Sequence, residues 1–300
     1  MRVALIVNLR IPARDYGGTE RVVTWLARGL AEHGHEVTIL APAGSTCESA
    51  RVIEIPFVRG QERHLDLHPL LPLGIDVVHA HFPLHGPREL PFLWTLHGNA
   101  RSGELLPDRT VALSADHARR HDLTDWVHNG LDPSEYRFGA IKKDTDLFLG
   151  RLHTVKGWHW ALNGANRTGR RIIMAGGWRP SLRRNVQFVG KVAGGRKASL
   201  LAEAACLWMP ALWDEPFGLT TIEAMVSGTP VLGTRRGALP EIITPESGAM
   251  GETLDELVAL RASLDGMDPE RVRARVLEAF THRTMAANYE RLYREAIGRG

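Results

Sequence analysis

The sequence predicts an α/β fold of two doubly wound domains, each a parallel sheet covered by helices, that face a central cleft. Short β-branched runs alternate with longer segments of helical period along the chain, as in parallel sheets with crossover helices. The first run, Val3–Val7, is apolar at every position, which is typical of a strand buried on both faces. The same pattern starts again at Leu147, and 300 residues lie in the range of roughly 250–300 where single cores stop growing. We therefore expect two domains.

The first domain is expected over residues 1–140. After the first strand, apolar residues at helical spacing predict a helix over Val22–Ala31, and Gly34 is well placed to end it. The segment Gln61–Gly74, rich in Leu, Pro and His, predicts irregular structure that covers the sheet. The further strands expected in this domain are Val37–Leu40, Val52–Phe57, Ile75–His79, Phe92–Leu96 and Val111–Leu113.

The second domain is expected over residues 141–283. A polar run from Asp132 to Asp144 is interpreted as the linker that precedes it, and Leu147–Leu149 is its first expected strand. Helices are expected near 157–167, 195–205 and 219–227, and the tail Asp268–Ile297 is helical in composition. The other strands expected here are Arg171–Ala175, Val186–Val189, Leu207–Met209 and Pro230–Leu232.

The composition excludes several classes of protein. Apolar residues make up 44% of the chain and the formal net charge is only +3, so a disordered chain is excluded and no nucleic-acid partner is expected. Cys47 and Cys206 lie far apart and can form neither a disulfide framework nor a Cys-rich zinc site, which fits a reducing compartment. No apolar run approaches the ~18 residues of a membrane helix. The apolar stretch at the N-terminus is too short for a secretory signal. We expect a cytoplasmic protein, or one peripheral to the inner face of the membrane, without a transmembrane segment.

Ligands of an open α/β sheet bind where strands end and helices begin, so residues at these junctions are candidates for ligand binding. The segment Asp214–Met225 follows an expected strand and opens a helix. A glycine at this entry lets the backbone approach a ligand, and the first N–H groups at Gly218–Thr221 would point at an anion. Glu215 and Glu223 could accept hydrogen bonds from sugar or ribose hydroxyls. Alternatively, Glu215 complements the helix dipole and Glu223 is a solvated helix residue.

Two cations follow the first strand of the second domain. Arg151 can donate hydrogen bonds to two phosphate oxygens at once, and Lys156 supplies a positive charge nearby. The pair is therefore interpreted as a diphosphate clamp. In the first domain, Gly17 and Gly18 lie between the first strand and the first helix, where a tight turn can offer backbone N–H groups to a ligand. The fingerprints of dinucleotide binders and of P-loop proteins are absent.

In their order along the chain, these motifs resemble the family 4 glycosyltransferases. The Glu-x7-Glu spacing in its Glu-Pro-Phe-Gly-Leu context is the most specific of them, and together they span about residues 1–250. The motifs that carry the resemblance are Tyr16–Glu20, Thr95–Gly98, Val127–Asp132, Gly150–Gly157 and Glu215–Val231.

The resemblance implies a GT-B fold, in which two Rossmann-like domains hold a nucleotide-sugar donor. It implies metal-independent transfer of a sugar from a UDP- or GDP-sugar, with retention of anomeric configuration and without a cofactor. The acceptor would be a small molecule, a glycan or a lipid. The second domain would bind the donor, the first would form the acceptor side, and the terminal helix, residues 284–300, would pack back on the first domain.

The resemblance also implies roles for single residues. Glu215, His97, Arg151 and Lys156 would be catalytic, with Arg151 and Lys156 on the diphosphate and Glu215 on the donor sugar. Glu223 would accept the ribose hydroxyls. The other donor-binding positions implied are Gly17 and Gly18 in a loop over the phosphates, Gly190 and Val192 in the base-binding loop, and Phe217, Gly218, Leu219 and Thr220 around sugar and phosphate.

Two further motifs are interpreted as structural, and two other functions stay open. Asp144-Thr145-Asp146 spells the Asp-x-Asp of metal-dependent glycosyltransferases of another fold, but it lies in the polar run and is expected to be a solvated linker. His79, His81 and His85 have no partner spaced to complete a metal site, so no metal is expected. The alternatives are an epimerase or phosphorylase on the same fold, or a nucleotide-sugar binding module without catalysis.

Overall fold

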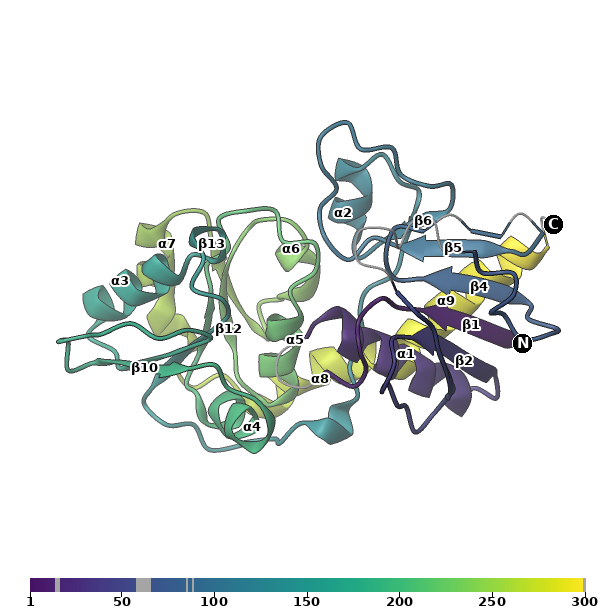
Figure 1. Ribbon diagram of the computed structural model, residues 1–300. Helices are drawn as coiled ribbons and strands as arrows, with labels where there is room; N and C mark the ends of the chain where they lie inside the picture. The colour runs from purple at the N-terminus through teal and green to yellow at the C-terminus, as the bar shows by residue number, and fades with distance from the viewer. Residues whose placement is uncertain (14–16, 58–65, 85, 88, 299–300) are drawn as a thin grey trace. The chain divides into compact units, whose positions relative to one another are not determined.

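The structure is a computed structural model that describes residues 1–13, 17–57, 66–84, 86–87 and 89–298. Two compact units make up the chain: unit 1 comprises Met1–Leu131 and Thr281–Gly300, and unit 2 comprises Asp132–Phe280. Figure 1 shows a sheet with helices in each. Tyr16, residues 61–65, His85 and the last two residues of the expected terminal helix lie outside the described residues.

Unit 1 contains a seven-stranded parallel sheet with the strand order β3-β2-β1-β4-β5-β6-β7. Its central strand β1 pairs with β2 on one side and with β4 on the other, and every residue of β1 after Arg2 is buried. The segment 66–74 is irregular, as predicted, and Leu67 packs into the core against the sheet. The elements are β1 (Arg2–Ile6), α1 (Thr19–Glu32), β2 (Glu36–Ala41), β3 (Arg51–Glu54), β4 (Val77–Ala80), β5 (Phe92–Thr95), β6 (Thr110–Ala112), α2 (Ala115–Arg120), β7 (Asp125–Trp126) and α9 (His282–Ile297).

The C-terminal helix α9 belongs to unit 1, where it lies beside α1 (Figure 1). The two helices approach closely because Gly29 has no side chain: a Cβ there would lie 2.5 Å from the carbonyl oxygen of His282. Glu32 of α1 accepts hydrogen bonds from His282 and Arg283 of α9. Burial raises the pKa of Glu32, but these hydrogen bonds and one from Arg28 outweigh it and lower the pKa to about 2.

Unit 2 contains a six-stranded parallel sheet with the strand order β10-β9-β8-β11-β12-β13. Both units are therefore doubly wound parallel α/β structures, and the predicted fold class is confirmed. The elements are two short 3₁₀ helices (Pro133–Glu135 and Thr154–Lys156), β8 (Asp146–Leu149), α3 (Trp158–Thr168), β9 (Ile172–Ala175), β10 (Val186–Gly190), α4 (Gly194–Glu203), β11 (Leu207–Met209), α5 (Leu219–Val226), β12 (Val231–Thr234), α6 (Leu239–Ile242), β13 (Gly248–Gly251), α7 (Leu254–Leu260), a third 3₁₀ helix (Arg261–Leu264) and α8 (Pro269–Ala279).

The polar run from Asp132 to Asp144 is not a free linker. Its residues belong to unit 2 and are fixed there by hydrogen bonds. The Lys142 ammonium donates to the carbonyl oxygens of Ala202 and Ser227 and to the Thr229 hydroxyl. Lys142 thus satisfies backbone carbonyl groups of unit 2, and Lys143 pairs with Glu203, roles that composition does not distinguish from solvation.

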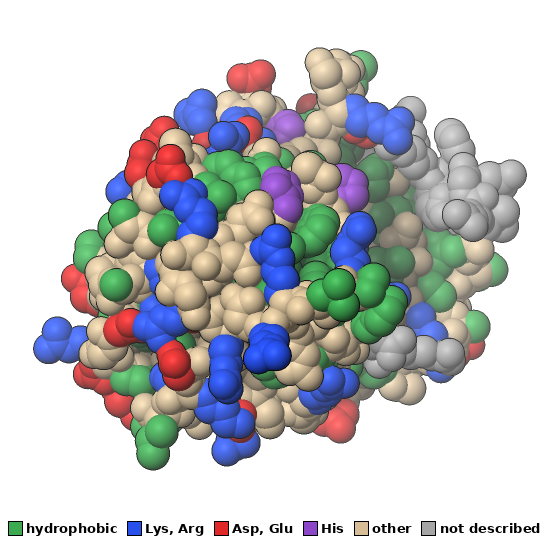
Figure 2. All heavy atoms as spheres, turned by 90° about the vertical axis from the view of Figure 1, so that its left-hand side faces the viewer, with side chains coloured by type: hydrophobic (Ala, Val, Ile, Leu, Met, Phe, Trp, Pro, Cys, Tyr) green, Lys and Arg blue, Asp and Glu red, His purple; other side chains and the backbone are tan. Residues whose placement is uncertain are grey.

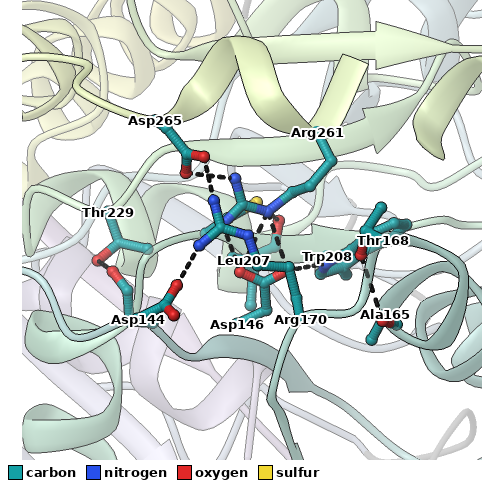
Figure 3. Close-up of polar contacts among 12 residues, drawn as sticks. Asp144, Asp146, Ala165, Thr168, Arg170, Leu207, Trp208, Thr229, Arg261 and Asp265 are labelled. Carbon is teal, nitrogen blue, oxygen red and sulfur yellow. Dashed lines mark hydrogen bonds and ion pairs between the residues drawn. The ribbon is translucent and has the colours of Figure 1, made fainter. Parts of the chain in front are cut away.

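The expectation that Asp144-Thr145-Asp146 is solvated is wrong for Asp146. This residue starts β8 with 0% of its surface exposed. Its carboxylate accepts hydrogen bonds from the Nη2 atom of Arg261 at 2.6 Å, from the Nε atom of Arg261 at 2.9 Å and 3.1 Å, and from the Trp208 indole at 2.8 Å. Figure 3 shows that Arg261 and Arg170 both also contact Asp265, and that Arg170 contacts Asp144. Asp146 is thus a structural acid in a buried pair with Arg261, from which the ion network extends to the exposed side chains of Asp265 and Asp144.

Candidate functional site

Strands β8 and β11 form the switch point of the unit 2 sheet, because the chain leads from β8 to β9 on one side and from β11 to β12 on the other. Open α/β sheets bind ligands at the carboxyl ends of the strands at such a point. The loop after β8, residues 150–157, and the loop after β11, residues 210–218, therefore outline the candidate site of this unit.

These two loops are locked together by backbone contacts. The N–H group of Leu212 donates to the carbonyl oxygen of Val155 at 2.8 Å. Gly157 has a φ of +66°, and a Cβ there would lie only 1.8 Å from the carbonyl oxygen of Pro210. Only glycine allows the two loops this close approach. The predicted site residues on both loops are consequently held at fixed positions relative to each other.

Lys156 and Glu215, two of the predicted catalytic residues, form an ion pair across these loops. The Lys156 ammonium donates to the Glu215 carboxylate at 2.6 Å and lies over the ring of Trp213, 4.7 Å from its centroid. The Trp213 indole donates to the same carboxylate oxygen at 2.9 Å. Glu215 is buried and Lys156 is half-buried, so a charge-assisted contact of this kind is well shielded from water. The structure brings the two residues together as partners of one another.

The backbone of Glu215 is fixed by the loop between β12 and α6. The N–H group of Ala238 donates to the carbonyl oxygen of Glu215 at 2.9 Å. Gly237 has a φ of +59°, and a Cβ there would lie 2.3 Å from the carbonyl oxygen and 2.4 Å from the nitrogen of Glu215. Sequence reasoning missed Gly237, because it lies 22 residues after the Glu215 that it supports and outside the motif Glu215–Val231.

Helix α5 begins directly after the loop that follows β11, residues 210–218. Its N-cap residue Gly218 has a φ of +95°, a conformation that favours glycine. The Phe217 side chain is buried and packs edge-on against Phe280, and the Thr220 side chain is buried beside Met209. Because these side chains point into the unit, backbone N–H groups are what this segment can offer to a ligand, and the first N–H groups of a helix lack intrahelical acceptors. Leu219, the remaining predicted position here, is half-buried.

Glu223 lies one turn into α5 and is completely buried, with 0% of its surface exposed. Its Oε1 atom accepts hydrogen bonds from the Tyr136 hydroxyl at 2.8 Å and from the Lys197 ammonium at 2.7 Å. The interpretation as a solvated helix residue is therefore wrong. Neither Tyr136 nor Lys197 was identified from the sequence, since nothing in their local sequence signals that they converge on Glu223.

The other predicted donor-binding residues of unit 2 occupy loops after β8 and β10. Arg151 directly follows β8 and its side chain is exposed; no acidic side chain of the described residues pairs with it. Gly190 ends β10 with a φ of +73°, and its carbonyl oxygen accepts a hydrogen bond from the N–H group of Gly176 at 2.7 Å. Val192 is buried. Arg151 is thus accessible to an anion, whereas Val192 can act only through its backbone.

The positive charge of unit 2 is concentrated in one stretch. Between Asp146 and Glu203 the sequence contains eleven Lys and Arg and no Asp or Glu. Figure 2 shows cationic side chains gathered on the face that α3, β10 and α4 contribute. Within the described part of unit 2, no acidic side chain pairs with seven of the eleven: Arg151, Arg171, Arg179, Arg183, Arg184, Lys191 and Arg196. This concentration favours an anionic ligand.

In unit 1, the predicted residues lie after β1 and β5. Gly17 and Gly18 lead into α1, and Gly18 is its N-cap residue. His97 follows β5 and is half-buried, and one of its ring nitrogens bonds to His81 at 2.9 Å. Burial, assisted by repulsion from His117, lowers the pKa of His97 to about 3. At neutral pH its ring is therefore a neutral hydrogen-bonding group.

The described residues contain no group of three or more His, Cys, Asp or Glu side chains that could hold a metal ion. They also contain no helix with both the length and the apolar character that crossing a membrane requires.

Comparisons with known proteins agree with this architecture. Residues 16–134 match the family model described as Glycosyltransferase Family 4, and residues 143–264 match the model described as Glycosyl transferases group 1. The crystal structure of AviGT4, a glycosyltransferase involved in avilamycin A biosynthesis, superposes with a TM-score of 0.80 and 29% sequence identity, over 100% of this chain and 98% of that one.

Two curated relatives show how the similarity is distributed. The phosphatidyl-myo-inositol mannosyltransferase of Mycolicibacterium smegmatis is 25% identical over 95% of this chain and 92% of its own length. The MMP alpha-(1->4)-mannosyltransferase of Mycolicibacterium hassiacum is 36% identical over 114 residues, which are 34% of this chain and 27% of that protein.

The two parallel-sheet units and the matches to both of them define a glycosyltransferase with a GT-B fold. More narrowly, the chain belongs to glycosyltransferase family 4.

Proposed function

We propose that the protein transfers a sugar from a UDP- or GDP-sugar to a small-molecule, glycan or lipid acceptor, with retention of anomeric configuration and without a metal ion. The observation that carries the proposal is the contact of Lys156 with Glu215 and Trp213 at the switch point of the unit 2 sheet, next to the N-terminus of α5. A cation and a carboxylate at one point suit a donor whose diphosphate is anionic and whose sugar carries hydroxyl groups.

On the donor side, we propose that Arg151, Lys156 and the first backbone N–H groups of α5 hold the diphosphate. Glu215 would then accept hydrogen bonds from the donor sugar, and Glu223 from the ribose. Gly190 and Val192 would contact the base through their backbone, and Gly17 and Gly18 would contact the phosphates. His97 would hydrogen-bond the transferred sugar.

The chemistry follows from where charge develops. As the bond between the anomeric carbon and the phosphate oxygen breaks, its electron pair stays on the phosphate, and Arg151, Lys156 and the helix N–H groups stabilise that charge. The acceptor oxygen bonds to the anomeric carbon on the face that the phosphate leaves. The leaving phosphate oxygen takes the acceptor proton, so the products are a glycoside and a nucleoside diphosphate. Removing one such charge-stabilising donor costs about 2.7–4 kcal/mol in the transition state.

The test is to incubate the protein with UDP- and GDP-sugars and measure nucleoside diphosphate release, with and without EDTA. Mannose donors come first, because both relatives are named as mannosyltransferases. We expect release that EDTA does not abolish, and a product whose anomeric configuration, determined by NMR, equals that of the donor. Inversion would contradict the retaining mechanism, and loss of activity in EDTA would contradict metal independence.

The same assay separates the alternatives. An epimerase would change the sugar without releasing nucleoside diphosphate, and a phosphorylase would release a sugar phosphate in the presence of inorganic phosphate. A binding module would bind donors without turnover. Substitution Glu215→Gln would then leave its affinity for the donor unchanged, and there would be no turnover for the substitution to abolish.

A further inference from the structure

Four histidines of unit 1 gather around the loop that carries His97. His79 lies in β4, His81 directly follows it, and His117 lies in α2. The Nδ1 atom of His81 and the Nε2 atom of His97 are 2.9 Å apart, and the centroids of the two rings are separated by 5.2 Å. His81 is buried, whereas His97 is half-buried at the end of this chain of contacts.

His81 is itself held in place by the core of unit 1. Its ring packs against that of His79, with 4.2 Å between centroids. The two nitrogens of His79 bond to the Tyr293 hydroxyl and the Thr95 hydroxyl, each at 2.7 Å. Since Tyr293 belongs to α9, the C-terminal helix fixes the orientation of His79 and, through it, the ring of His81.

A second support reaches the same loop from α2. The Nδ1 atom of His117 accepts a hydrogen bond from the N–H group of Leu113 at 3.1 Å, so its hydrogen lies on Nε2. That Nε2 atom donates to the carbonyl oxygen of Gly98 at 3.2 Å. Arg120 donates to the side-chain oxygen of Asn99 at 3.1 Å. The residues after His97 are thus fixed independently of His81.

The histidines of this group are neutral at physiological pH. Burial lowers the pKa of His79 to about 3, lowers that of His81 well below its ordinary value, and lowers that of His117 to about 4. A hydrogen bond between two neutral imidazoles needs one N–H donor and one bare nitrogen acceptor. The Nε2 atom of His81 is buried and has no hydrogen-bond partner among the described residues, so a hydrogen there would be an unsatisfied donor. The hydrogen of His81 therefore lies on Nδ1 and is donated to Nε2 of His97, which leaves the hydrogen of His97 on its Nδ1.

We infer that His81 is a positioning residue for His97: their hydrogen bond fixes the ring orientation and the tautomer with which His97 meets the donor sugar. The inference rests on the proposed function in one respect, namely that His97 acts on that sugar. The orientation of His97 itself follows from contacts within unit 1 alone.

The direct test is ¹⁵N NMR of the full chain labelled at histidine, which reports the tautomer of each imidazole. In the unsubstituted protein we expect a single tautomer of His97. In His81→Phe, which keeps an aromatic ring against His79 but removes the hydrogen bond, we expect His97 to populate both tautomers. An unchanged single tautomer in His81→Phe would overturn the inference.

Kinetics supply the second readout, with nucleoside diphosphate release as the assay. We expect His81→Phe to lower kcat about 10- to 100-fold, because misplacing a group near the chemistry has costs of this size, with a change below about threefold in the donor KM. His81→Asn, whose amide can again bond to His97, should recover part of kcat. A loss confined to KM, or no rescue by His81→Asn although this variant is folded, would contradict a positioning role.

His282→Asn is the matched control, because His282 is also a buried histidine of unit 1 but bonds to Glu32 of α1. It should leave the His97 tautomer and kcat unchanged, and an equal loss would point to a general effect on unit 1. If His81→Phe does not fold, the tautomer of His97 is measured in His81→Asn. If the unsubstituted protein releases no nucleoside diphosphate from any donor, the proposed function fails while the NMR result still decides the positioning of His97.

Discussion

Glu215 forms an ion pair with Lys156, and the same carboxylate is proposed to bind the donor sugar. A diphosphate that engages Lys156 must therefore compete with Glu215 for the ammonium. The ion pair keeps the lysine side chain ordered over Trp213 at the position where the phosphate is expected, which reduces the side-chain entropy lost on binding.

Replacing Glu215 by Gln should separate these two roles. We expect the affinity for a free nucleoside diphosphate to rise about two- to fivefold, because Lys156 loses a competing partner worth roughly 0.5–1 kcal/mol. Turnover of the nucleotide sugar should fall. Isothermal titration calorimetry and the release assay measure the two effects. Glu203→Gln is the control, since Glu203 pairs with Lys143 in the same unit. Weaker binding of the nucleoside diphosphate to Glu215→Gln would contradict the competition.

Asp146 permits a second prediction at the scale of one residue. Substitution Asp146→Ala leaves the Arg261 guanidinium, 1% exposed, without its main counterion, so the free energy of unfolding should fall by about 3–5 kcal/mol. Adding Arg261→Met should restore much of the loss, because the uncompensated charge is removed. Urea unfolding checks both variants. Arg167→Ala, which breaks an exposed pair with Asp255, should cost at most about 1 kcal/mol; a similar cost for Asp146→Ala would refute the structural role.

At the scale of elements, the site depends on three loops of unit 2 whose glycines allow close backbone contact. Gly157 brings the loop after β8 against Pro210, and Gly237 brings the loop after β12 against Glu215. The sheet places the strand ends side by side, and these close backbone contacts fix the positions of the loops relative to one another.

Gly237→Ala should displace Glu215 and lower turnover at least about tenfold, since a 1 Å misplacement near the chemistry can cost up to about 100-fold. Gly266→Ala is the matched control: Gly266 also has a left-handed φ, +80°, but no atom lies within 4 Å of the position its Cβ would take. Both variants should lose about 1–2 kcal/mol of stability from the backbone conformation. The test compares the kcat values of the two variants. Equal kcat values would rule out the proposed support of the Glu215 backbone by Gly237.

The elements that were predictable from the sequence are those with a strong local signal. Apolar runs such as Val3–Val7 and the helix that ends near Gly34 correspond to β1 and α1. The strand β13 was not expected, because Gly-Ala-Met-Gly has poor β-propensity and forms a strand only through its pairing with β12. The tail is two helices, α8 and α9, separated at Phe280–Thr281 without a glycine or proline to signal the break.

The site was predictable to a similar extent. Lys156, Glu215 and Glu223 lie in motifs with a recognisable spacing; the structure places Lys156 and Glu215 in loops that lead from a strand to a helix, and Glu223 one turn into α5. Tyr136 and Lys197 could not be found in this way, because they are 87 and 26 residues from Glu223 and meet it only in the folded unit. Their contact with Glu223 is a property of tertiary structure.

On the scale of the whole molecule, the charge is distributed unevenly. The stretch between Asp146 and Glu203 carries eleven cations although the net charge of the chain is +3, so the rest of the chain is acidic. A field of this kind raises the local concentration of an anionic ligand and is screened by salt.

The donor KM should consequently rise with ionic strength, by roughly two- to fivefold between low salt and 0.15 M, as the Debye length falls to about 8 Å. The pair substitution Arg183→Ser and Arg184→Ser should reduce this salt dependence, because both cations lie in the acid-free stretch and neither pairs with an acid of the described residues. Steady-state kinetics at several salt concentrations measure it. Arg291→Ser with Arg294→Ser, in α9, is the control. A salt dependence identical in the two double variants would contradict the role of the basic stretch.

The buried histidines predict how the stability of the protein depends on pH. His79 and His117 are completely buried, and their pKa values of about 3 and about 4 lie below the ordinary value near 6.5. Between pH 6.5 and these lower values, the unfolded chain binds a proton at each histidine and the folded chain does not. The free energy of unfolding should therefore be highest above about pH 7. As the pH falls below 6.5, each histidine should lower the free energy of unfolding by up to ~1.4 kcal/mol per pH unit. This decrease in stability should level off near pH 3–4.

Urea unfolding from pH 7.5 to pH 4.5 tests this dependence. His117→Gln, whose amide can still accept from Leu113 and donate to Gly98, should reduce the slope by the contribution of one proton. His68→Gln, at an exposed histidine whose pairing with Glu89 is open to solvent, should leave the slope unchanged. A slope in His117→Gln equal to that of the unsubstituted protein would contradict the role of His117. Glu32 does not affect this comparison, because its pKa of about 2 makes its contribution disappear only as the pH falls from about 4.5 towards 2.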